Sequence, residues 1–274
     1  MKKLLCMLLL ACLALTGCAA ESADTGGEEL TAVFLDVGKA DAILLYNGEM
    51  AALIDAGEND DGDAVVEAIR ARGIERLDLM IITHFDKDHV GGADKVLEQI
   101  EVARVLEPGY EKDSKQVRQY REALAAAGVE AEALTENVEF TLGGCGFAID
   151  VANADDYGSD EENDFSLVTR LTHGGVRFLF AGDAENARLA ELLDEGDLDS
   201  DVLKVPHHGR YERLSAAFFA AVSPQYAVVA SSQDDLEDAE TVYALQAAGA
   251  QVLLTRNGAV EIVSDGESAR LARP

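Results

Sequence analysis

The sequence predicts an α/β domain in which helices cover β-sheets. From residue 31 to residue 264, short apolar segments typical of strands alternate with segments of helical spacing. Apolar residues make up 48% of the 274-residue chain, which can fill a sizeable core and argues against disorder. No linker interrupts residues 30–265, so a single domain is the simplest organisation.

The first half of the domain is expected to form strands first and helices later. Turn-forming residues such as Gly38 separate the first strands, and Gly73 and Gly128 end two of the helices. The expected elements are strands at 31–37, 41–47 and 50–56, a helix at 63–73, a buried strand at 76–83, and helices at 93–100 and 113–128.

The second half alternates strands and helices more regularly. We expect His173 to be an exposed turn residue, because it lies with two glycines between two strands. We also expect the last two strands to form a hairpin around Asn257-Gly258. The expected elements are strands at 147–153, 165–172 and 176–182, a helix at 184–194, a strand at 201–206, a helix at 214–222, a strand at 226–231, a helix at 236–249, and strands at 251–255 and 259–264.

Residues 1–18 have the features of an export signal. Lys2 and Lys3 precede an apolar stretch that is too short for a reliable membrane-spanning helix. Its end, Leu-Thr-Gly-Cys18, resembles the bacterial lipoprotein box, in which the cysteine is lipidated; an ordinary signal peptide is the alternative. Residues 19–30 are small and polar, as in a flexible tether. We expect an exported protein anchored through Cys18 to the outer face of the cytoplasmic membrane, or to an outer membrane.

Charge and cysteine content limit the partners of the folded part. The formal net charge is −30, which disfavours long nucleic acid and anionic lipid, so we expect contact with the membrane through the anchor only. Cys145 is the one cysteine beyond the signal, so no internal disulfide can form, and we expect a packed or turn residue there. The acidic segment 154–164 is expected to be a surface loop near the functional site.

The strongest chemical signal is the segment THFDKDHVGG, which directly follows the apolar run LDLMIIT. It places His84, Asp86, Asp88 and His89 on one short loop at the end of a buried strand, where sites of α/β proteins usually form. Imidazole and carboxylate together suit zinc, and the weight of carboxylates also suits manganese or iron. Four such groups on one loop can face two metal ions.

Five further segments occur in a recognisable order along the chain: FLDVGKADAILL, LIDAG, NDFSLVTRL, FLFAGD and LKVPHHG. Together with the metal loop they resemble the metallo-β-lactamase superfamily, whose usual signature is His-x-His-x-Asp-His. The variant with Asp86 in place of the second histidine resembles the metallohydrolase domain of the competence protein ComEC and its secreted relatives. The resemblance covers nearly all of residues 31–265 and implies a four-layer αββα sandwich, so residues 31–274 are expected to form one hydrolase domain.

The resemblance implies a dinuclear centre with zinc ahead of manganese. His84 and Asp86 would hold one ion, Asp88 and His89 would hold the other, and Asp183 would bridge both. For Asp183 the alternative is a helix N-cap worth about 1 kcal/mol, but a carboxylate at the end of a buried strand is costly without a cation. The pair His207-His208 would supply a further ligand; the sequence does not decide which, with a slight preference for His207. The expected catalytic residues are Asp88, Asp183 and His208.

Residues around the expected centre are assigned supporting roles. Asn163 and Ser166 could bind substrate or hold their loop, with equal weight for the two roles. Arg210 stands where relatives commonly have serine, and it could grip a phosphate. Lys39 stands where the family usually has glutamine, which leaves that position without an assigned role. The remaining carboxylates of the matching segments are expected to orient the loops around the metals: Asp36, Asp41 and Asp55.

The predicted function is metal-dependent hydrolysis outside the cell, with a small or oligomeric phosphodiester as the leading substrate. Hydrolysis of another ester, such as phosphorylcholine on an envelope polymer, is the alternative within enzymes. A lactam is disfavoured by Asp86 in the metal loop. From a different class, the protein could be a metal-binding envelope protein with little turnover.

Overall fold

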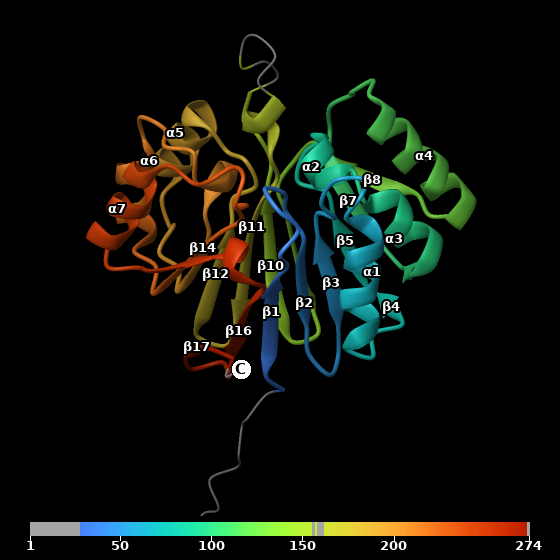
Figure 1. Ribbon diagram of the computed structural model, residues 1–274, viewed down its shortest axis with the longest axis horizontal. Coiled ribbons are helices and arrows are strands. Elements are labelled where there is room, and N and C mark those ends of the chain that lie inside the picture. Colours follow the sequence, from blue (N-terminus) through green and yellow to red (C-terminus); the bar gives the residue numbers. More distant parts are fainter. Residues whose placement is uncertain (1–27, 155–156, 158–161, 273–274) are drawn as a thin grey trace, which may run out of the picture.

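The computed structural model describes residues 28–154, 157 and 162–272. Its strands form an eight-stranded sheet, a seven-stranded sheet and a small two-stranded pair. Helices cover the outer faces of the two large sheets, so the four-layer αββα arrangement is confirmed (Figure 1). The expected signal at 1–18 with Cys18, and residues 19–27 of the expected tether at 19–30, lie outside the described residues.

The first sheet has the strand order β17-β16-β1-β2-β3-β5-β7-β8. It consists of β1 (Leu30–Phe34), β2 (Ile43–Tyr46), β3 (Ala51–Ile54), β5 (Leu79–Ile81), β7 (Val105–Pro108), β8 (Ala131–Leu134), β16 (Val260–Ser264) and β17 (Ala269–Leu271). Its outer face packs against α1 (Gly62–Ala71), α3 (Ala93–Gln99) and α4 (Lys115–Ala127). The short strands β4 (Arg76–Leu77) and β6 (Glu101–Val102) pair beside it.

The second sheet has the strand order β15-β14-β13-β12-β11-β10-β9. It consists of β9 (Val138–Leu142), β10 (Cys145–Asp150), β11 (Val168–His173), β12 (Val176–Phe180), β13 (Val202–Lys204), β14 (Tyr226–Val229) and β15 (Gln251–Leu254). Its outer face packs against α5 (Asn186–Glu195), α6 (Ser215–Val222) and α7 (Ala239–Ala247). Figure 1 shows these three helices on the flank opposite α1, α3 and α4.

Strand β1 shows how the sequence pattern builds the layers. Side chains alternate between the two faces of a strand, so neighbours along β1 enter different cores. Ala32 and Phe34 face the second sheet, whereas Val33 between them faces the helices of the first layer. All three are buried, and full burial of a side chain the size of valine or phenylalanine is worth about 1.5–3 kcal/mol.

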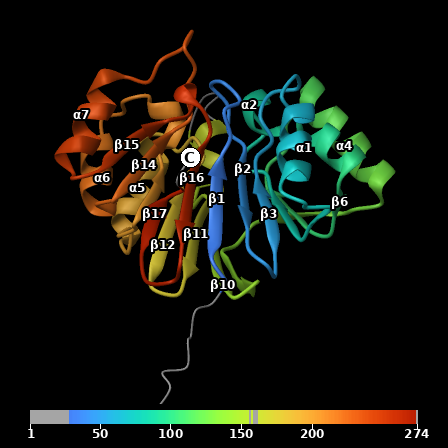
Figure 2. The ribbon, with the colours of Figure 1, turned by 60° about the horizontal axis from the view of Figure 1, so that its bottom comes forward.

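The expected hairpin around Asn257-Gly258 is wrong. Strand β15 ends the second sheet beside β14, whereas β16 pairs with β1 in the first sheet. The 3-10 turn η3 (Thr255–Asn257) lies between them, so the chain crosses from one sheet to the other at this point. Figure 2 shows β16 beside β1, which joins the beginning and the end of the domain. The Asn-Gly pair marks a turn correctly, but local sequence does not say which sheet the next strand joins.

The structure also bears on the expectations for His173, for further strands and for Cys145. The expectation that His173 is exposed is wrong, because only 7% of the residue is exposed and its Nδ1 lies 2.9 Å from the Ser264 hydroxyl oxygen. Strands β7, β8, β9 and β17 were not expected. Cys145 is buried and unpaired, as expected. None of the helices in the described ranges combines the length and the apolar character that a membrane span requires.

Strand ends from both sheets meet at the same edge of the sandwich. Parallel pairing joins β3 to β5 in the first sheet and β12 to β13 in the second. The residues that follow these four strands include Asp55, His84, Asp183 and His208. The fold therefore brings Asp55 and His208 to the same edge, although more than 150 positions separate them in the sequence.

Candidate metal centre

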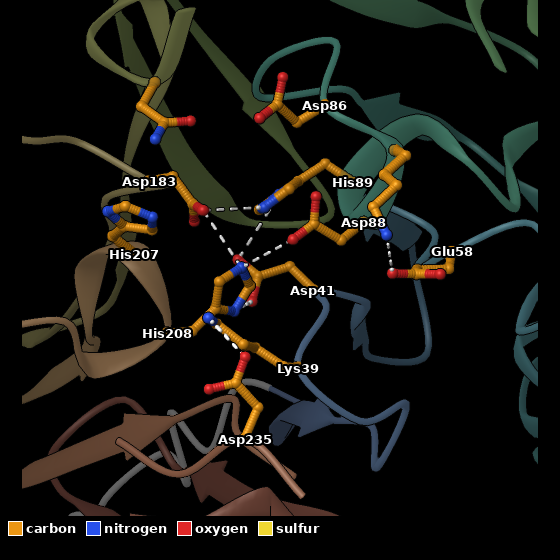
Figure 3. A network of polar contacts seen from close by, with 12 residues as sticks. Lys39, Asp41, Glu58, Asp86, Asp88, His89, Asp183, His207, His208 and Asp235 are labelled. Carbon is orange, nitrogen blue, oxygen red and sulfur yellow. Dashed lines mark hydrogen bonds and ion pairs between the residues drawn. The ribbon is translucent and has the colours of Figure 1, made fainter. Parts of the chain in front are cut away.

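Four side chains form a compact cluster between the two sheets: Asp88, His89, Asp183 and His208. One ligand-type atom of each lies within 4.8 Å of those of the other three. Asp88 and His89 come from α2 (Lys87–Val90), which follows β5, and Asp183 follows β12. His208 lies in η2 (Pro206–Gly209), which follows β13, and Figure 3 shows its ring directed toward Asp183 and Asp88.

The contacts within the cluster all converge on a small space. His208 Nε2 lies 3.1 Å from Asp183 Oδ2 and 3.4 Å from Asp88 Oδ2. His89 Nε2 lies 3.3 Å from the same Asp183 Oδ2. One carboxylate oxygen therefore faces two imidazole nitrogens, an arrangement that suits a cation shared among them.

Asp55 fixes the orientation of His89. Asp55 is fully buried in the left-handed conformation (φ 57°), and its Oδ2 lies 2.8 Å from His89 Nδ1. The Thr83 amide and hydroxyl donate to the two oxygens of the same carboxylate at 2.8 and 2.7 Å. When the Nδ1 proton is donated to Asp55, Nε2 of a neutral ring presents its lone pair to the cluster.

His84 is held as a neutral ring beside the cluster. Because the Thr83 hydroxyl donates to Asp55, its oxygen is left to accept a hydrogen bond from His84 Nδ1–H at 3.1 Å. Burial, reinforced by the neighbouring His89, lowers the pKa of His84 to about 4. His84 Nε2 is buried without a hydrogen-bond partner and is thus free to ligate.

A buried lysine compensates part of the negative charge. Lys204 is 1% exposed at the end of the apolar strand β13, and its Nζ contacts Asp41 and the Gly182 carbonyl, the latter at 2.9 Å. The same ammonium lies 3.4 Å from Asp183 Oδ1, the oxygen that faces away from the histidines. Asp41 in turn places Oδ1 at 3.6 Å from His208 Nδ1.

The residues present fit a divalent cation. Nε2 of His84, His89 and His208 is buried in each case without a well-formed hydrogen bond, and those of His89 and His208 face the Asp183 carboxylate, so all three nitrogens are placed to bind an ion. Nearby carboxylates, with Asp183 foremost, outweigh burial and raise the pKa of His208 to about 9 and that of His89 well above its usual value. Those protons supply the positive charge that a metal ion would otherwise provide.

His207 points away from this cluster. Both histidines of the pair have left-handed backbones (φ 46° and 51°), and the two rings lie 6.3 Å apart between centroids. His207 Nδ1 lies 2.9 Å from Glu185 Oε1, which also accepts from the Asn163 amide at 2.9 Å. Of the two histidines the structure therefore brings His208 to the four-residue cluster, against the slight preference for His207.

Three other expected site residues lie outside the cluster. Asp86 places its side chain at the surface, 36% exposed, where Lys112 Nζ donates to Oδ1 at 2.6 Å. Asp36 is exposed, with no hydrogen bond or ion pair to any residue in the described ranges, so the expectation that it orients the metal loop is not supported. Arg210 is exposed and lowers the pKa of Glu185 together with His207, which places its charge at the edge of the site.

Ser166 is a buried residue that contacts both Asp183 and His84. It is fully buried, its hydroxyl oxygen accepts from the Asp183 amide at 3.0 Å, and it lies 3.4 Å from His84 Nδ1. These contacts are those of a residue that holds the loop, which was one of its two expected roles. Asn163 likewise contacts Glu185 rather than the cluster.

Residues 35–232 match the model of the family described as the metallo-β-lactamase superfamily. This match covers more than half of the chain. The chain belongs to the metallo-β-lactamase superfamily. The resemblance that its motifs carry is thereby confirmed at the level of the family, and the fold of this superfamily implies binding of divalent metal.

The curated relatives are competence and recombination proteins. ComE operon protein 3 of Bacillus subtilis is 29% identical over 176 residues, which cover 62% of this chain and 22% of that protein. Competence protein ComA of Neisseria gonorrhoeae is 28% identical over 201 residues, which cover 72% of this chain and 26% of that protein. Recombination protein 2 of Haemophilus influenzae is 25% identical over 204 residues, which cover 73% of this chain and 24% of that protein. The chain thus spans about a quarter of the length of these relatives and is similar to their metallo-β-lactamase domain.

Solved structures of the superfamily share the fold. The metallo-β-lactamase fold protein YhfI from Bacillus subtilis has a TM-score of 0.56 at 11% identity, covering 83% of this chain and 96% of that one. A diphosphatase of the PhnP family has a TM-score of 0.51 at 17% identity, with coverages of 82% and 94%. CmlA, a diiron β-hydroxylase from Streptomyces venezuelae, has a TM-score of 0.52 at 14% identity, with coverages of 90% and 54%. The reactions in these names differ, so the shared fold does not determine the reaction.

Three residues that shape the centre or its surroundings were missed in the sequence analysis. Thr83 orders the hydrogen bonds of His84 and Asp55, Glu185 holds His207, and Lys204 neutralises buried carboxylates. A lysine inside the apolar run DVLKVP was a usable signal, because a buried charge requires a partner. Thr83 and Glu185 carried no comparable signal, since threonine and glutamate are ordinary at a strand end and near a helix start.

Proposed function

We propose that this protein is a metal-dependent hydrolase that cleaves a phosphodiester outside the cell. The observation that carries the proposal is the buried cluster of Asp88, His89, Asp183 and His208, with imidazole nitrogens that lack partners. Asp88 is the member that reaches solvent, with 22% of its side chain exposed. Substrate can therefore approach the cluster from the side of Asp88.

A divalent ion in this cluster would activate water as a nucleophile and stabilise negative charge on the substrate. The protein's own groups prepare the place for it. Asp55 orients His89, Asp41 lies against His208, and Lys204 keeps one oxygen of Asp183 occupied. The family motifs support zinc ahead of manganese, and they support a second ion at His84 and Asp86.

The cations around the cluster support an anionic substrate. The chain carries a net charge of −30, yet Lys39, Lys87, Lys112 and Arg210 all lie on loops or helix ends beside the metal residues. Lys39 donates to Asp235 at 2.9 Å (Figure 3), and Lys87 donates to Glu58 at 2.8 Å. A phosphate oxygen can replace these exposed carboxylates at little cost, because exposed ion pairs are worth at most about 1 kcal/mol.

The names of the relatives support a phosphodiester as the bond class. They are called competence and recombination proteins, and both words refer to the handling of DNA. The net charge of this chain disfavours a long polyanion, so we propose a small or oligomeric phosphodiester as substrate.

The proposed location follows from the sequence of the first 18 residues and accords with the competence-protein relatives. Cys18 would carry lipid and hold the protein at the outer face of a membrane. Replacing Cys18 with serine should release the protein from the membrane fraction or leave it unprocessed. Normal processing together with unchanged membrane association would refute the lipid anchor.

The reaction is tested with the full chain loaded with zinc or manganese. A bis-aryl phosphodiester, a phosphomonoester and an aryl ester serve as reporters, each with and without chelator. We expect hydrolysis of the phosphodiester, loss of activity on chelation, and recovery on return of the metal. A metal-loaded protein that cleaves only the ester would favour the phosphorylcholine type of reaction. A metal-loaded protein that is inactive on all three would favour a binding protein.

A further inference from the structure

Asp86 is the expected ligand that the structure separates most clearly from the others. Figure 3 shows its carboxylate apart from the group formed by Asp88, His89, Asp183 and His208. Its side chain is 36% exposed, whereas His89, Asp183 and His208 are almost fully buried. A specific partner rather than free rotation accounts for this position.

That partner is Lys112, from the loop between β7 and α4. Lys112 Nζ lies 2.6 Å from Asp86 Oδ1 and also contacts Glu162 from the other side. The lysine side chain is 24% exposed, so its ammonium is partly withdrawn from water and held between two carboxylates. Because this ion pair is partly buried, water and salt screen it less than a fully exposed pair.

The position next to Asp86 retains some features of a metal site. His84 Nε2 is buried without a hydrogen-bond partner and lies 4.0 Å from Asp86 Oδ2. Two ligands of one ion, each about 2.0–2.2 Å from it, can be no more than about 4.4 Å apart. His84 and Asp86 can therefore share an ion, but only at nearly the largest separation that a common ion permits.

Two lysines oppose an ion at that position. Lys112 occupies one oxygen of Asp86, and Lys204 lies 3.4 Å from Asp183 Oδ1, one oxygen of the carboxylate expected to bridge. Each ammonium also repels a divalent cation, because like charges only a few ångströms apart interact strongly where water is partly excluded. Of the two, Lys112 is near the surface and contacts Asp86 directly.

We propose that Lys112 makes the His84–Asp86 position a low-affinity metal site, so that the protein holds one ion tightly and a second only when metal is abundant. This inference rests on the proposed metal centre. The four-residue cluster binds the first ion, and the second ion must displace Lys112 from Asp86 or bind beside it. Lys112 thus decides how many metal ions the centre contains.

The test is metal stoichiometry, independent of turnover. The full chain is freed of metal and titrated with Zn²⁺ by calorimetry, and bound zinc is measured after equilibrium dialysis at fixed free zinc. Lys112→Met removes the charge and keeps the length of the side chain; Lys112→Gln is a second variant of the same kind. Lys115→Met is the matched control, since Lys115 is an exposed lysine three positions away without an ion pair in the described ranges.

For the unmodified protein we expect one tight equivalent of zinc and a second that binds at least about tenfold more weakly. Lys112→Met and Lys112→Gln should tighten the second equivalent by about tenfold and leave the first unchanged, whereas Lys115→Met should change neither. When Asp86→Asn is combined with Lys112→Met, the tighter binding of the second equivalent should disappear. Two equivalents of equal affinity, or a second equivalent that is unchanged or weakened in both Lys112 variants, would overturn the inference while leaving the metal centre intact. Failure to bind even the first equivalent would overturn both.

Discussion

The buried cluster and the cations around it are built in opposite ways. Asp183 and His208 are 3% and 2% exposed, and their orientation depends on other buried groups. Lys39 and Lys87 are 27% and 64% exposed, and each makes one ion pair with a carboxylate that is itself exposed. Removal of one buried partner leaves an uncompensated charge, whereas an exposed partner is replaced by water.

This difference assigns separate tasks to the two regions. The cluster joins residues that follow β5 in the first sheet to residues that follow β12 and β13 in the second, so a change in it disturbs contacts between the two sheets. The surrounding cations can change with little effect on stability, so they are free to adapt to the substrate. We therefore expect substitutions in the cluster to affect metal binding and stability, and substitutions in the surroundings to affect substrate affinity.

The largest effect is expected for Asp183→Ala. This carboxylate faces both His89 and His208, so its loss should weaken metal binding and reduce kcat by about 10³-fold or more. Activity on the phosphodiester reporter and zinc content after dialysis measure the two effects. Retention of both would show that the cluster is not the metal centre.

A large effect on stability is expected for Lys204→Met. Without this ammonium, Asp41 and Asp183 remain buried with less compensation, so metal-free protein should lose about 3 kcal/mol of unfolding free energy. Bound metal should reduce the loss, because it supplies positive charge to the same carboxylates. Lys39→Met is the matched control and should cost less than about 1 kcal/mol. Urea unfolding measures both; equal losses would remove the distinction between the two regions.

A pH effect of intermediate size is expected from His208. Carboxylates raise its pKa from 6.5 to about 9, so its proton stabilises the metal-free fold fully below pH 6.5, and this contribution disappears as pH rises to about 9. Metal affinity should change in the opposite direction, by about tenfold per pH unit for one released proton. Unfolding in chelator and zinc titrations at several pH values test the two trends. Metal-free stability that increases between pH 7 and 9 would contradict this account.

The smallest effect is expected for Arg210→Ala. An exposed guanidinium that holds the phosphate equally in the ground state and the transition state should raise KM by roughly tenfold or less and leave kcat nearly unchanged. Arg270→Ala, which removes a similarly exposed arginine on β17, is the control and should have no effect. A large loss of kcat in the Arg210 variant would place this residue in the reaction itself.

The motifs predicted the fold and much of the candidate site because they lie at the ends of buried strands. LDLMIIT, VRFLFAG and DVLKVP are apolar enough to be recognised as strands, and the residues after them meet where the strands end. The family resemblance supplied the four layers, which alternation of strands and helices alone does not determine.

The remaining features depend on contacts between distant segments. The ion pair of Asp86 with Lys112 spans 26 positions, and nothing in the metal loop itself indicates it. The choice between His207 and His208 depends on backbone torsions inside one four-residue turn. The transfer of the chain from β15 to β16 depends on which sheet has an unpaired edge, and a local Asn-Gly pair cannot report that.

The direction of β1 has a consequence for how the proposed hydrolase would be presented on a cell. The strand runs from Leu30 to Phe34, and the loop that follows carries Asp41 to the metal residues. An anchor attached ahead of Leu30 would therefore hold the protein by the end of the sheet opposite its active centre. Attachment at that end would leave the opening of the metal centre unobstructed by the anchor, so that dissolved molecules and cell-wall polymers could enter it.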